Sequence, residues 1–376
     1  MRSSEPARRR QGRTGFWFVA PAVVATAAIA SWSVAFASGS TKGYGTPSPG
    51  RYKQHNLVSD QAGKADMRDP DLVNAWGLSF GPSTPAWVSD NGTNVSTLYS
   101  GDVNGTPVTK LPFTVSIPGG APTGTVFNNS QSFVVSRGGS SSPASFLFSS
   151  EAGKITAWSQ GLPLSDKAQT VATVRGAIFK GLAIADTGKS PRLYATDFHH
   201  GRVDVWNGKF SMVHRHGAFR DPRLPARFAP FGIEAVGGKI FVTYAKQDAN
   251  AKNDVPGAGK GFVDVFRTSG KLVRRFASRG PLDSPWGIAK APQGFGSASG
   301  DLLIGNFGNG WINAFDPKSG KLLGALHGKK GRPLAIKGLW ALKFGNGVIG
   351  TPHTLLFTAG PGGEEHGLCG DLTPGG

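Results

Sequence analysis

The sequence contains a single cysteine, Cys369, so no disulfide bond can form within the chain. Charged residues make up only 17% of the chain, and the acidic ones are the scarcer kind, with 23 Asp and Glu against 41 Lys and Arg. We expect no nucleophile elbow of the G-x-S-x-G type, no H-E-x-x-H zinc motif and no glycine loop that opens a helix for phosphate binding. We therefore expect none of the local motifs of the common hydrolases, zinc proteases and nucleotide-binding enzymes.

Glycine and proline are abundant, with 55 and 26 residues in a chain of 376. This composition is rich in turns, yet 39% of the residues are hydrophobic, which is enough for a core. It argues against both a helix bundle and a disordered chain. We expect Cys369 to be a small buried hydrophobic residue, because a catalytic thiol would need a positioned base.

Residues 1–37 have the features of a signal peptide. Five arginines precede an apolar run from Phe16 to Ala37, which ends in Ala35-Phe36-Ala37, a pattern that signal peptidase accepts. We expect cleavage after Ala37, a flexible spacer over residues 38–53, and an exported protein that is secreted or held in the cell wall. The alternative is an uncleaved membrane anchor, because the run approaches the roughly 20 residues that span a bilayer. Cleavage removes five arginines and one glutamate and lowers the net charge from +18 to +14.

The rest of the chain repeats a unit of four short strand patterns separated by turns of Gly, Pro and Asn. Each unit begins with a small residue that follows an aromatic or other side chain, at Trp76-Gly77, Thr123-Gly124, Lys180-Gly181, Phe231-Gly232, Trp286-Gly287 and Trp340-Ala341. A period of roughly fifty residues with four strands is typical of β-propeller blades. We predict an all-β, six-bladed β-propeller over residues 54–372, followed by a tail, 373–376. Glycine fits an innermost strand, where backbones crowd around the axis.

Residues 54–59 form a strand pattern without a hairpin partner after it. We predict that this N-terminal strand pairs into the last blade and closes the ring, because an open ring would leave two exposed sheet edges. In the fourth unit a polar insertion, residues 247–260, lengthens the middle hairpin. Long loops on a rigid scaffold often carry function, although an insertion without function fits equally well.

Several motifs near the two ends carry a resemblance to a known family: His55–Asp60, Leu72–Leu78, Val88–Gly92 and Leu356–Leu368. With them the chain resembles a family of exported bacterial proteins with NHL-like six-bladed propellers, over roughly Asn56 to Leu372. The resemblance implies the fold and export, and it implies no particular activity. The units carry neither the WD40 nor the kelch signature.

Loops between the second and third strands of all blades should meet on one face, around the axis. They carry carboxylates and amides, which we predict as candidate metal ligands: Asp90, Asn91, Glu151, Asp197, Asn306 and Glu364. Oxygen ligands suit hard cations such as Ca²⁺. Alternatively, Asp and Asn serve the turns in which they lie. We expect the adjacent His199 and His200 to be solvated or to pack within their loop.

Basic residues gather near the junctions between blades: Arg175, Lys180, Arg220, Arg223, Arg227, Arg279, Lys329, Lys330, Arg332 and Lys337. We expect them to rim the same face around a more acidic centre, where they would attract anionic partners. The candidate ligand-binding residues among them are Arg220, Arg223, Arg227, Arg279, Lys330 and Arg332. The alternative is an ordinary solvated basic surface.

Two functions fit this pattern. The favoured one is a binding or scaffold module that presents its basic-rimmed loop face to an anionic cell-wall polymer or to a protein. The other is a Ca²⁺-dependent hydrolase similar to lactonase-type propellers. Export and the lack of a nucleic-acid-binding fold signature argue against nucleic acid as a partner. We expect a monomer that contacts the membrane only through the N-terminal segment, if that segment is uncleaved. No catalytic residue is identified.

Overall fold

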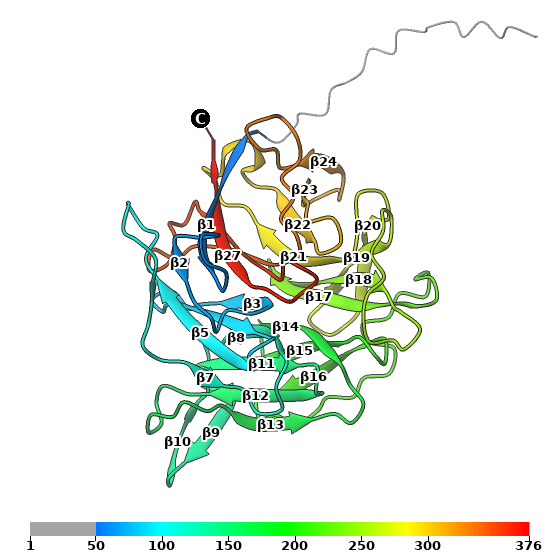
Figure 1. Cartoon of the computed structure of the whole chain (residues 1–376). Coiled ribbons are helices and arrows are strands. Elements are labelled where there is room, and N and C mark those ends of the chain that lie inside the picture. The colour runs from blue at the N-terminus through cyan, green and yellow to red at the C-terminus, as the bar shows by residue number, and fades with distance from the viewer. Residues whose placement is uncertain (1–49, 376) are drawn as a thin grey trace, which may run out of the picture. The chain divides into compact units, whose positions relative to one another are not determined.

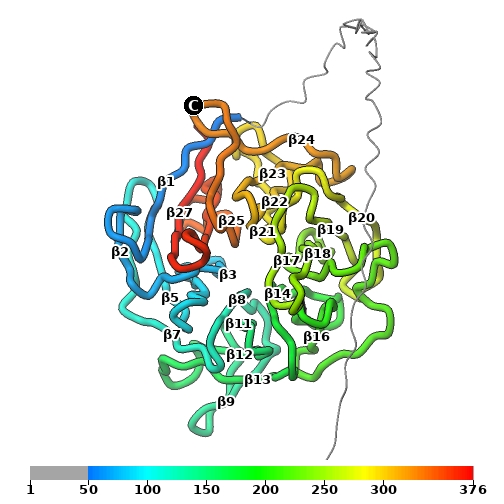
Figure 2. The backbone as a smooth tube through the Cα atoms, turned by 45° about the vertical axis from the view of Figure 1, so that its right-hand side comes forward, coloured from blue at the N-terminus to red at the C-terminus, as the bar shows by residue number. Residues whose placement is uncertain are grey.

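The computed structural model describes residues 50–375, and these residues form a six-bladed β-propeller (Figure 2). Within this range the only helix is a single 3-10 turn, Gly296–Ala298, and no helix has the length and hydropathy to cross a membrane. The prediction of an all-β propeller is confirmed. The predicted signal peptide, and residues 38–49 of the predicted spacer, lie outside the described residues.

The strands of each blade follow one another from the axis outward (Figure 1). Blade 1 contains β3 (Ala75–Ser79), β4 (Ala86–Asp90), β5 (Val95–Ser100), β6 (Thr109–Lys110) and β7 (Val115–Ser116). Blade 2 contains β8 (Pro122–Phe127), β11 (Phe146–Ser150), β12 (Lys154–Trp158) and β13 (Gln169–Thr173), with an additional hairpin of β9 (Val134–Arg137) and β10 (Ser140–Pro143). Blade 3 contains β14 (Phe179–Asp186), β15 (Pro191–Asp197) and β16 (Arg202–Asn207).

The remaining blades complete the ring. Blade 4 contains β17 (Phe228–Val236), β18 (Lys239–Lys246), β19 (Gly261–Arg267) and β20 (Leu272–Ser278). Blade 5 contains β21 (Pro285–Lys290), β22 (Leu302–Asn306), β23 (Ile312–Phe315) and β24 (Leu322–Ala325). Blade 6 contains β25 (Leu339–Phe344), β26 (Leu355–Ala359), β27 (Leu368–Pro374), β1 (Tyr52–Ser59) and β2 (Met67–Arg68).

The ring closes in blade 6, where strands from both ends of the chain lie side by side (Figure 1). Strand β1 runs antiparallel to β27, with Tyr52 opposite Pro374 and Ser59 opposite Leu368. This pairing confirms the predicted closure by the N-terminal strand. Cys369 on β27 is buried and free, as expected.

Glycine on the innermost strands is required by the neighbouring blade. A Cβ atom on Gly232 would lie 2.0 Å from the carbonyl oxygen of Trp286, and one on Gly287 would lie 2.5 Å from that of Trp340. Similarly, a Cβ atom on Gly77 would lie 2.4 Å from the carbonyl oxygen of Thr123. Consecutive inner strands therefore approach one another as backbones, which confirms the reason given for these glycines.

In four of the blades, hydroxyl groups also join the inner strand to the next blade. The hydroxyl of Thr243 accepts a hydrogen bond from the Gly232 amide at 2.8 Å and donates one to the Pro285 carbonyl of the next blade at 2.5 Å. Thr196 and Thr358 do the same in blades 3 and 6. In blade 2 two hydroxyls are used: that of Ser149 accepts the hydrogen bond from the Gly124 amide, and that of Thr123 donates to the Phe179 carbonyl of the next blade. The two hydroxyls also bond to each other. In every blade the register between the first and second strands shifts near the inner glycine or alanine. In the four blades described here, the amide of that residue bonds to the hydroxyl instead of to the second strand's backbone.

Candidate functional site

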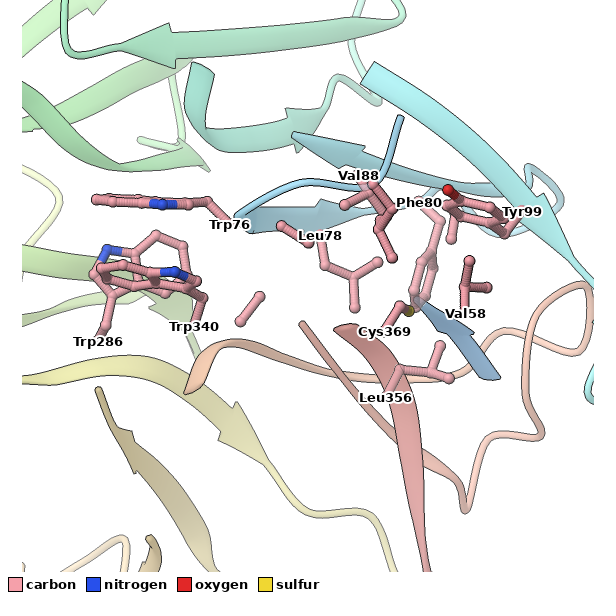
Figure 3. Packing of buried hydrophobic residues seen from close by; sticks show 14 of the residues in the cluster. Val58, Trp76, Leu78, Phe80, Val88, Tyr99, Trp286, Trp340, Leu356 and Cys369 are labelled. Atoms are coloured by element: carbon pink, nitrogen blue, oxygen red, sulfur yellow. The ribbon is translucent and has the colours of Figure 1, made fainter. Parts of the chain in front are cut away.

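A layer of six side chains, one from each blade, crosses the axis of the ring. They are the residues directly before the inner glycine or alanine: Trp76, Thr123, Lys180, Phe231, Trp286 and Trp340. The rings of Trp76 and Trp340 stack with centroids 3.7 Å apart, and Trp286 meets Trp340 edge to face at 5.8 Å (Figure 3). Because these indoles are buried, side chains fill the axis at this level, and a ligand can approach only from a face.

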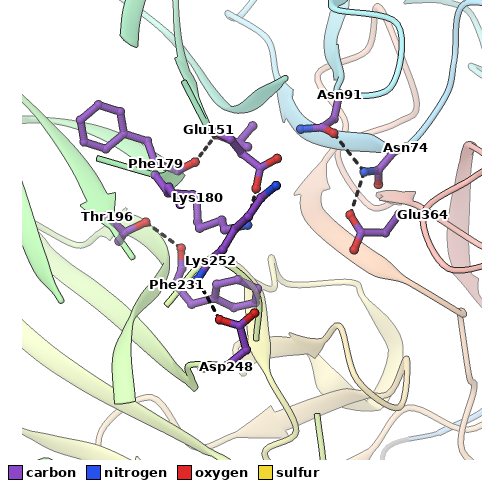
Figure 4. A network of polar contacts seen from close by, with 12 residues as sticks. Asn74, Asn91, Glu151, Phe179, Lys180, Thr196, Phe231, Asp248, Lys252 and Glu364 are labelled. Atoms are coloured by element: carbon purple, nitrogen blue, oxygen red, sulfur yellow. Dashed lines mark hydrogen bonds and ion pairs between the residues drawn. The ribbon is translucent and has the colours of Figure 1, made fainter. Parts of the chain in front are cut away.

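Lys180 is the one charged member of this layer. Its Nζ atom lies 2.5 Å from Oε1 of Glu151, which follows β11 (Figure 4). The same Nζ atom lies 4.9 Å from the centroid of the Trp76 ring and 5.9 Å from that of Phe198, a cation–π environment. The side chain of Lys180 is only 4% exposed, whereas that of Glu151 is 20% exposed. Lys180 therefore lies at the buried centre of the face and not on its rim.

Glu364 approaches the same centre from the loop between β26 and β27. Its Oε2 atom accepts a hydrogen bond of 2.8 Å from Nδ2 of Asn74 (Figure 4). Oδ1 of Asn74 in turn accepts one of 3.0 Å from the indole nitrogen of Trp340. Burial raises the pKa of Glu364; the Asn74 hydrogen bond and Lys180 oppose this rise, and Glu151 adds to it. The four polar groups thus form one electrostatic unit above the aromatic layer.

The insertion of blade 4 brings a further carboxylate to this unit. Burial raises the pKa of Asp254, and Lys180 is among the charges that oppose the rise. Oδ2 of Asp254 is buried without a hydrogen-bond partner among the described residues, and Oδ1 of Asn306 is in the same state. The insertion is also anchored to blade 3, since Nε2 of Gln247 donates to the carbonyl of Phe198 at 2.5 Å. The insertion is therefore ordered by contacts and contributes to the site.

Of the six predicted metal ligands, Glu151 and Glu364 come together at this centre. Asn91 lies beside them, with its Oδ1 atom accepting a hydrogen bond of 3.2 Å from Asn74. Nδ2 of Asn306 donates to the Pro281 carbonyl at 2.7 Å, in the connection before β21, and to Oδ1 of Asn309 at 3.0 Å, in its own loop.

Asp90 and Asp197 face other partners. Oδ2 of Asp90 accepts hydrogen bonds from the amide and the hydroxyl of Thr97, within blade 1. Asp197 binds Nδ1 of His200 at 2.6 Å and the His200 amide at 3.2 Å, which stabilises its own turn. The structure thus does not join the six predicted residues into one ligand set.

The six basic candidates are all exposed, but they do not form one closed rim. Arg227 flanks the insertion, because its guanidinium donates to the Asp248 carbonyl, and the guanidinium of Arg279 lies 5.4 Å from the ring of Phe262 at the top of β19. Arg220 and Arg223 follow Phe219, whose amide bonds to Gly270 in the turn between β19 and β20. Lys330 and Arg332 lie in a loop that contacts the start of β1, at Tyr52. The cations are therefore spread along the outer connections between blades.

The buried acidic residues change the balance of charge at the surface. Within residues 50–375, one basic residue is buried, Lys180, against eight aspartates: Asp69, Asp90, Asp197, Asp204, Asp221, Asp264, Asp283 and Asp371. Lys110, Arg202 and Arg275 each contact two carboxylates. More acidic than basic groups are therefore buried or paired inside the protein. Because fewer acidic groups remain exposed, the outer surface is more positive than the net charge alone indicates.

Three members of the central unit, Lys180, Asn74 and Asp254, were not among the predicted site residues. Lys180 could have been recognised from the sequence as an unusual residue near the axis, because the position before the inner glycine or alanine is aromatic in four other blades. Asn74 and Asp254 lie outside any repeated pattern. Their place follows from the turn before β3 and from the path of the insertion.

One serine does lie in a G-x-S-x-G sequence, Gly77 to Gly81, contrary to our expectation that this pattern is absent. It does not form a nucleophile elbow, because Ser79 is the last residue of the innermost strand β3 and no helix follows it. Ser79 is buried, and its hydroxyl accepts a hydrogen bond of 2.9 Å from the Phe127 amide of the next blade. Its role is to join two inner strands.

Sequence comparison finds relatives among viral proteins. The chain is 32% identical to "Uncharacterized protein R648" of Acanthamoeba polyphaga mimivirus over 340 residues, 85% of this chain and 80% of that protein. It is 33% identical to "Uncharacterized protein L690" of the same virus over 343 residues, 85% of each. The chain belongs to the family of these two mimivirus proteins. No family model matches it. Because these relatives are viral, they do not support the bacterial origin implied by the resemblance described above.

Solved structures share the fold of this family member. A putative gluconolactonase aligns with a TM-score of 0.52 and 14% identity, covering 87% of this chain and 94% of that one. A glucose dehydrogenase aligns with a TM-score of 0.51 and 12% identity, covering 86% of this chain and 99% of that one. At such identities the similarity shows the six-bladed fold alone.

Proposed function

We propose that this protein is an exported binding module that takes up an anionic partner through the cationic surface of its blade-to-blade connections. The observation that carries the proposal is the burial of eight aspartates, which leaves the exposed basic residues without an equal number of exposed acidic ones. A surface of one sign raises the local concentration of oppositely charged partners and speeds their association.

The spacing of the cations favours an extended partner over a small ion. Arg223 lies between β16 and β17 and Arg332 between β24 and β25, so these two cations belong to connections of different blades. A polymer with repeated negative charges, such as an acidic cell-wall polymer, can contact several such positions at once, as can an acidic protein surface. Its binding would weaken with added salt, because exposed charges are screened over about 10 Å at 0.1 M ionic strength.

The centre of the loop face favours this function over a Ca²⁺-dependent hydrolase. The ammonium group of Lys180 pairs with Glu151 and acts on Glu364 and Asp254, so it supplies the positive charge that a bound cation would give these carboxylates. Asp90 and Asp197, which such a site would also need, bind groups of their own blades. The residues present therefore do not fit a calcium site of the lactonase type.

Export is part of the proposal and has its own test. The features of residues 1–37 support it, and the mature chain would begin at Ser38. N-terminal sequencing of the protein recovered outside the producing cells should give Ser38 as the first residue. Recovery of the intact chain inside the cells alone would contradict export without affecting the binding surface.

The binding proposal is tested with dextran sulfate as the polyanion probe. The triple variant Arg223→Ala, Lys330→Ala, Arg332→Ala removes three exposed cations from the connections. The matched control, Lys189→Ala, Lys239→Ala, Lys290→Ala, removes the same charge from exposed positions at or between the first and second strands of blades 3 to 5, outside the blade-to-blade connections. We expect the first variant to bind about tenfold more weakly than the wild type and the control to change by about twofold. Equal weakening in both would refute a localised surface.

A further inference from the structure

A second cluster of ionisable side chains lies at the seam of the ring, away from the loop-face centre. His55 comes from β1, Asp371 from β27, and Asp102 from the turn that follows β5 in blade 1. One candidate ligand atom from each of the three residues lies within 4.8 Å of the other two. The cluster therefore joins the strand that closes blade 6 to the neighbouring first blade.

Both ring nitrogens of His55 face carboxylates. Nδ1 lies 3.2 Å from Oδ2 of Asp371, and Nε2 lies 2.9 Å from Oδ2 of Asp66. A metal-bound histidine commonly donates its second N–H group to a carboxylate, which fixes the tautomer and the ring orientation. Asp66 is placed to accept that bond, which leaves Nδ1 directed at Asp371.

The carboxylate of Asp371 is a second, independent observation that points to a cation at this cluster. The side chain is only 4% exposed, and its Oδ2 atom accepts no hydrogen bond among the described residues, although Nδ1 of His55 is near. A carboxylate oxygen of Asp102 lies within 4.8 Å of one of Asp371, so the two acidic groups face each other across the cluster. A buried carboxylate that is repelled by another one needs a cation.

We propose that His55, Asp102 and Asp371 bind a divalent transition-metal ion, Zn²⁺ or Mn²⁺, with Asp66 as the hydrogen-bond partner of the histidine. One imidazole nitrogen and two carboxylates suit these ions better than Ca²⁺, which prefers oxygen ligands alone. Metal–ligand bonds of about 2.0 to 2.2 Å would require only a small closing of the cluster, because its atoms are already near one another.

Such an ion would stabilise the closure of the ring. It would tie β1, the fourth strand of blade 6, both to β27 and to the loop of blade 1 that carries Asp102. That loop already contacts blade 6, because the Gly101 amide bonds to the Val348 carbonyl at 2.8 Å. A ligand that binds only the folded state raises stability by mass action, so the effect can be measured as a shift in melting temperature.

The test uses the full chain, stripped with EDTA and then titrated separately with ZnCl₂, MnCl₂ and CaCl₂ at pH 7. We expect one equivalent of Zn²⁺ or Mn²⁺ to bind, and the melting temperature to rise by about 4 °C at a hundredfold excess over Kd. A larger response to CaCl₂ than to the other two ions, or no bound ion and an unchanged melting temperature, would overturn the proposal.

Variants separate a metal site from a simple ion pair of His55. Asp102→Asn removes one ligand charge, and Asp166→Asn makes the same change at an exposed position elsewhere. We expect Asp102→Asn to raise the melting temperature of the stripped protein, because it removes repulsion from Asp371, and to abolish the rise caused by metal. Asp166→Asn should keep the metal response. Retention of the full response by Asp102→Asn would contradict the assignment, and the opposite signs with and without metal exclude simple misfolding as the cause.

Discussion

Nζ of Lys180 lies 2.5 Å from Oε1 of Glu151, in a layer where four of the other five axial side chains are aromatic. The pair comes from two blades, since Lys180 is on β14 and Glu151 follows β11. It brings a positive charge into a buried centre that also contains Glu364 and Asp254. This relationship determines which chemistry the loop face supports, and it leads to the first prediction.

Replacing Lys180 by methionine should destabilise the fold strongly. The substitution keeps an unbranched apolar stem but leaves Glu151 without its cation beside buried carboxylates. Removal of one partner from a buried ion pair typically costs about 3 to 5 kcal/mol. Urea unfolding of Lys180→Met and of the wild type measures the difference.

The double variant Lys180→Met, Glu151→Gln is the control for this prediction. Because it removes both charges, it should recover about half of the lost stability or more. A loss in Lys180→Met below about 1 kcal/mol, or no recovery in the double variant, would show that the pair does not neutralise the centre.

Gly232→Ala should disrupt packing between blades 4 and 5. A Cβ atom at this position would lie 2.0 Å from the Trp286 carbonyl oxygen, which is backbone and cannot move aside easily. We expect a loss of about 3 kcal/mol or more in the free energy of unfolding. Gly328→Ala is the matched control, because its new Cβ atom would meet the flexible end of Leu334 at 3.1 Å and would lie 4.0 Å from the nearest backbone atom within reach, the Arg332 carbonyl oxygen. Equal stability of the two variants would argue against close backbone contact between inner strands.

Thr243→Val should remove the hydroxyl that joins Gly232 to Pro285 of the next blade. It leaves a buried amide and a buried carbonyl without this partner, at a cost of about 1 to 3 kcal/mol. Thr243→Ser keeps the hydroxyl and should retain most of the stability. Thermal unfolding of both variants provides the comparison, and a more stable valine variant would contradict the proposed bridge.

The stability of the protein should depend on pH through Asp264. Burial raises the pKa of Asp264 to about 6, against the opposing effect of the adjacent Arg275. Because the pKa is higher in the folded state, the folded chain holds the proton more tightly. This contribution to stability is fully present below the unfolded pKa of about 4 and is lost as the pH rises through 6.

Asp264→Asn removes this titration. Between about pH 4 and pH 6, the wild type should lose on the order of 2 to 3 kcal/mol relative to the variant. Urea unfolding of both proteins at several pH values measures the difference. A constant difference across this range would contradict the raised pKa.

The fold could be predicted from the sequence because its causes are local and repeated. Each blade repeats the inner glycine, short alternating strands and turns with the required residues, and the six inner positions were all identified. The prediction that residues 54–59 close the ring followed from the need to cover a sheet edge. In the structure, β1 covers that edge by pairing with β27. These inferences needed no knowledge of distant contacts.

The site could be predicted only in part, because its residues are placed by tertiary contacts. Glu151 and Glu364 are near the axis, but the same kind of loop directs Asp90 and Asp197 to Thr97 and His200. Loop position gives the face on which a residue lies and not the direction of its side chain. The charge of Lys180 was visible in the sequence, whereas its burial against Trp76 depends on packing around the axis.

The central claim, that an excess of exposed cations binds a polyanion, is tested most directly by the salt dependence of one affinity. The measurement is the Kd of the wild-type protein for dextran sulfate, taken from about 20 mM to about 300 mM NaCl. We predict clear binding at the lowest salt and a steep, continuous rise of Kd with salt. Absence of binding at 20 mM NaCl, or a Kd that does not change with salt, would contradict the account.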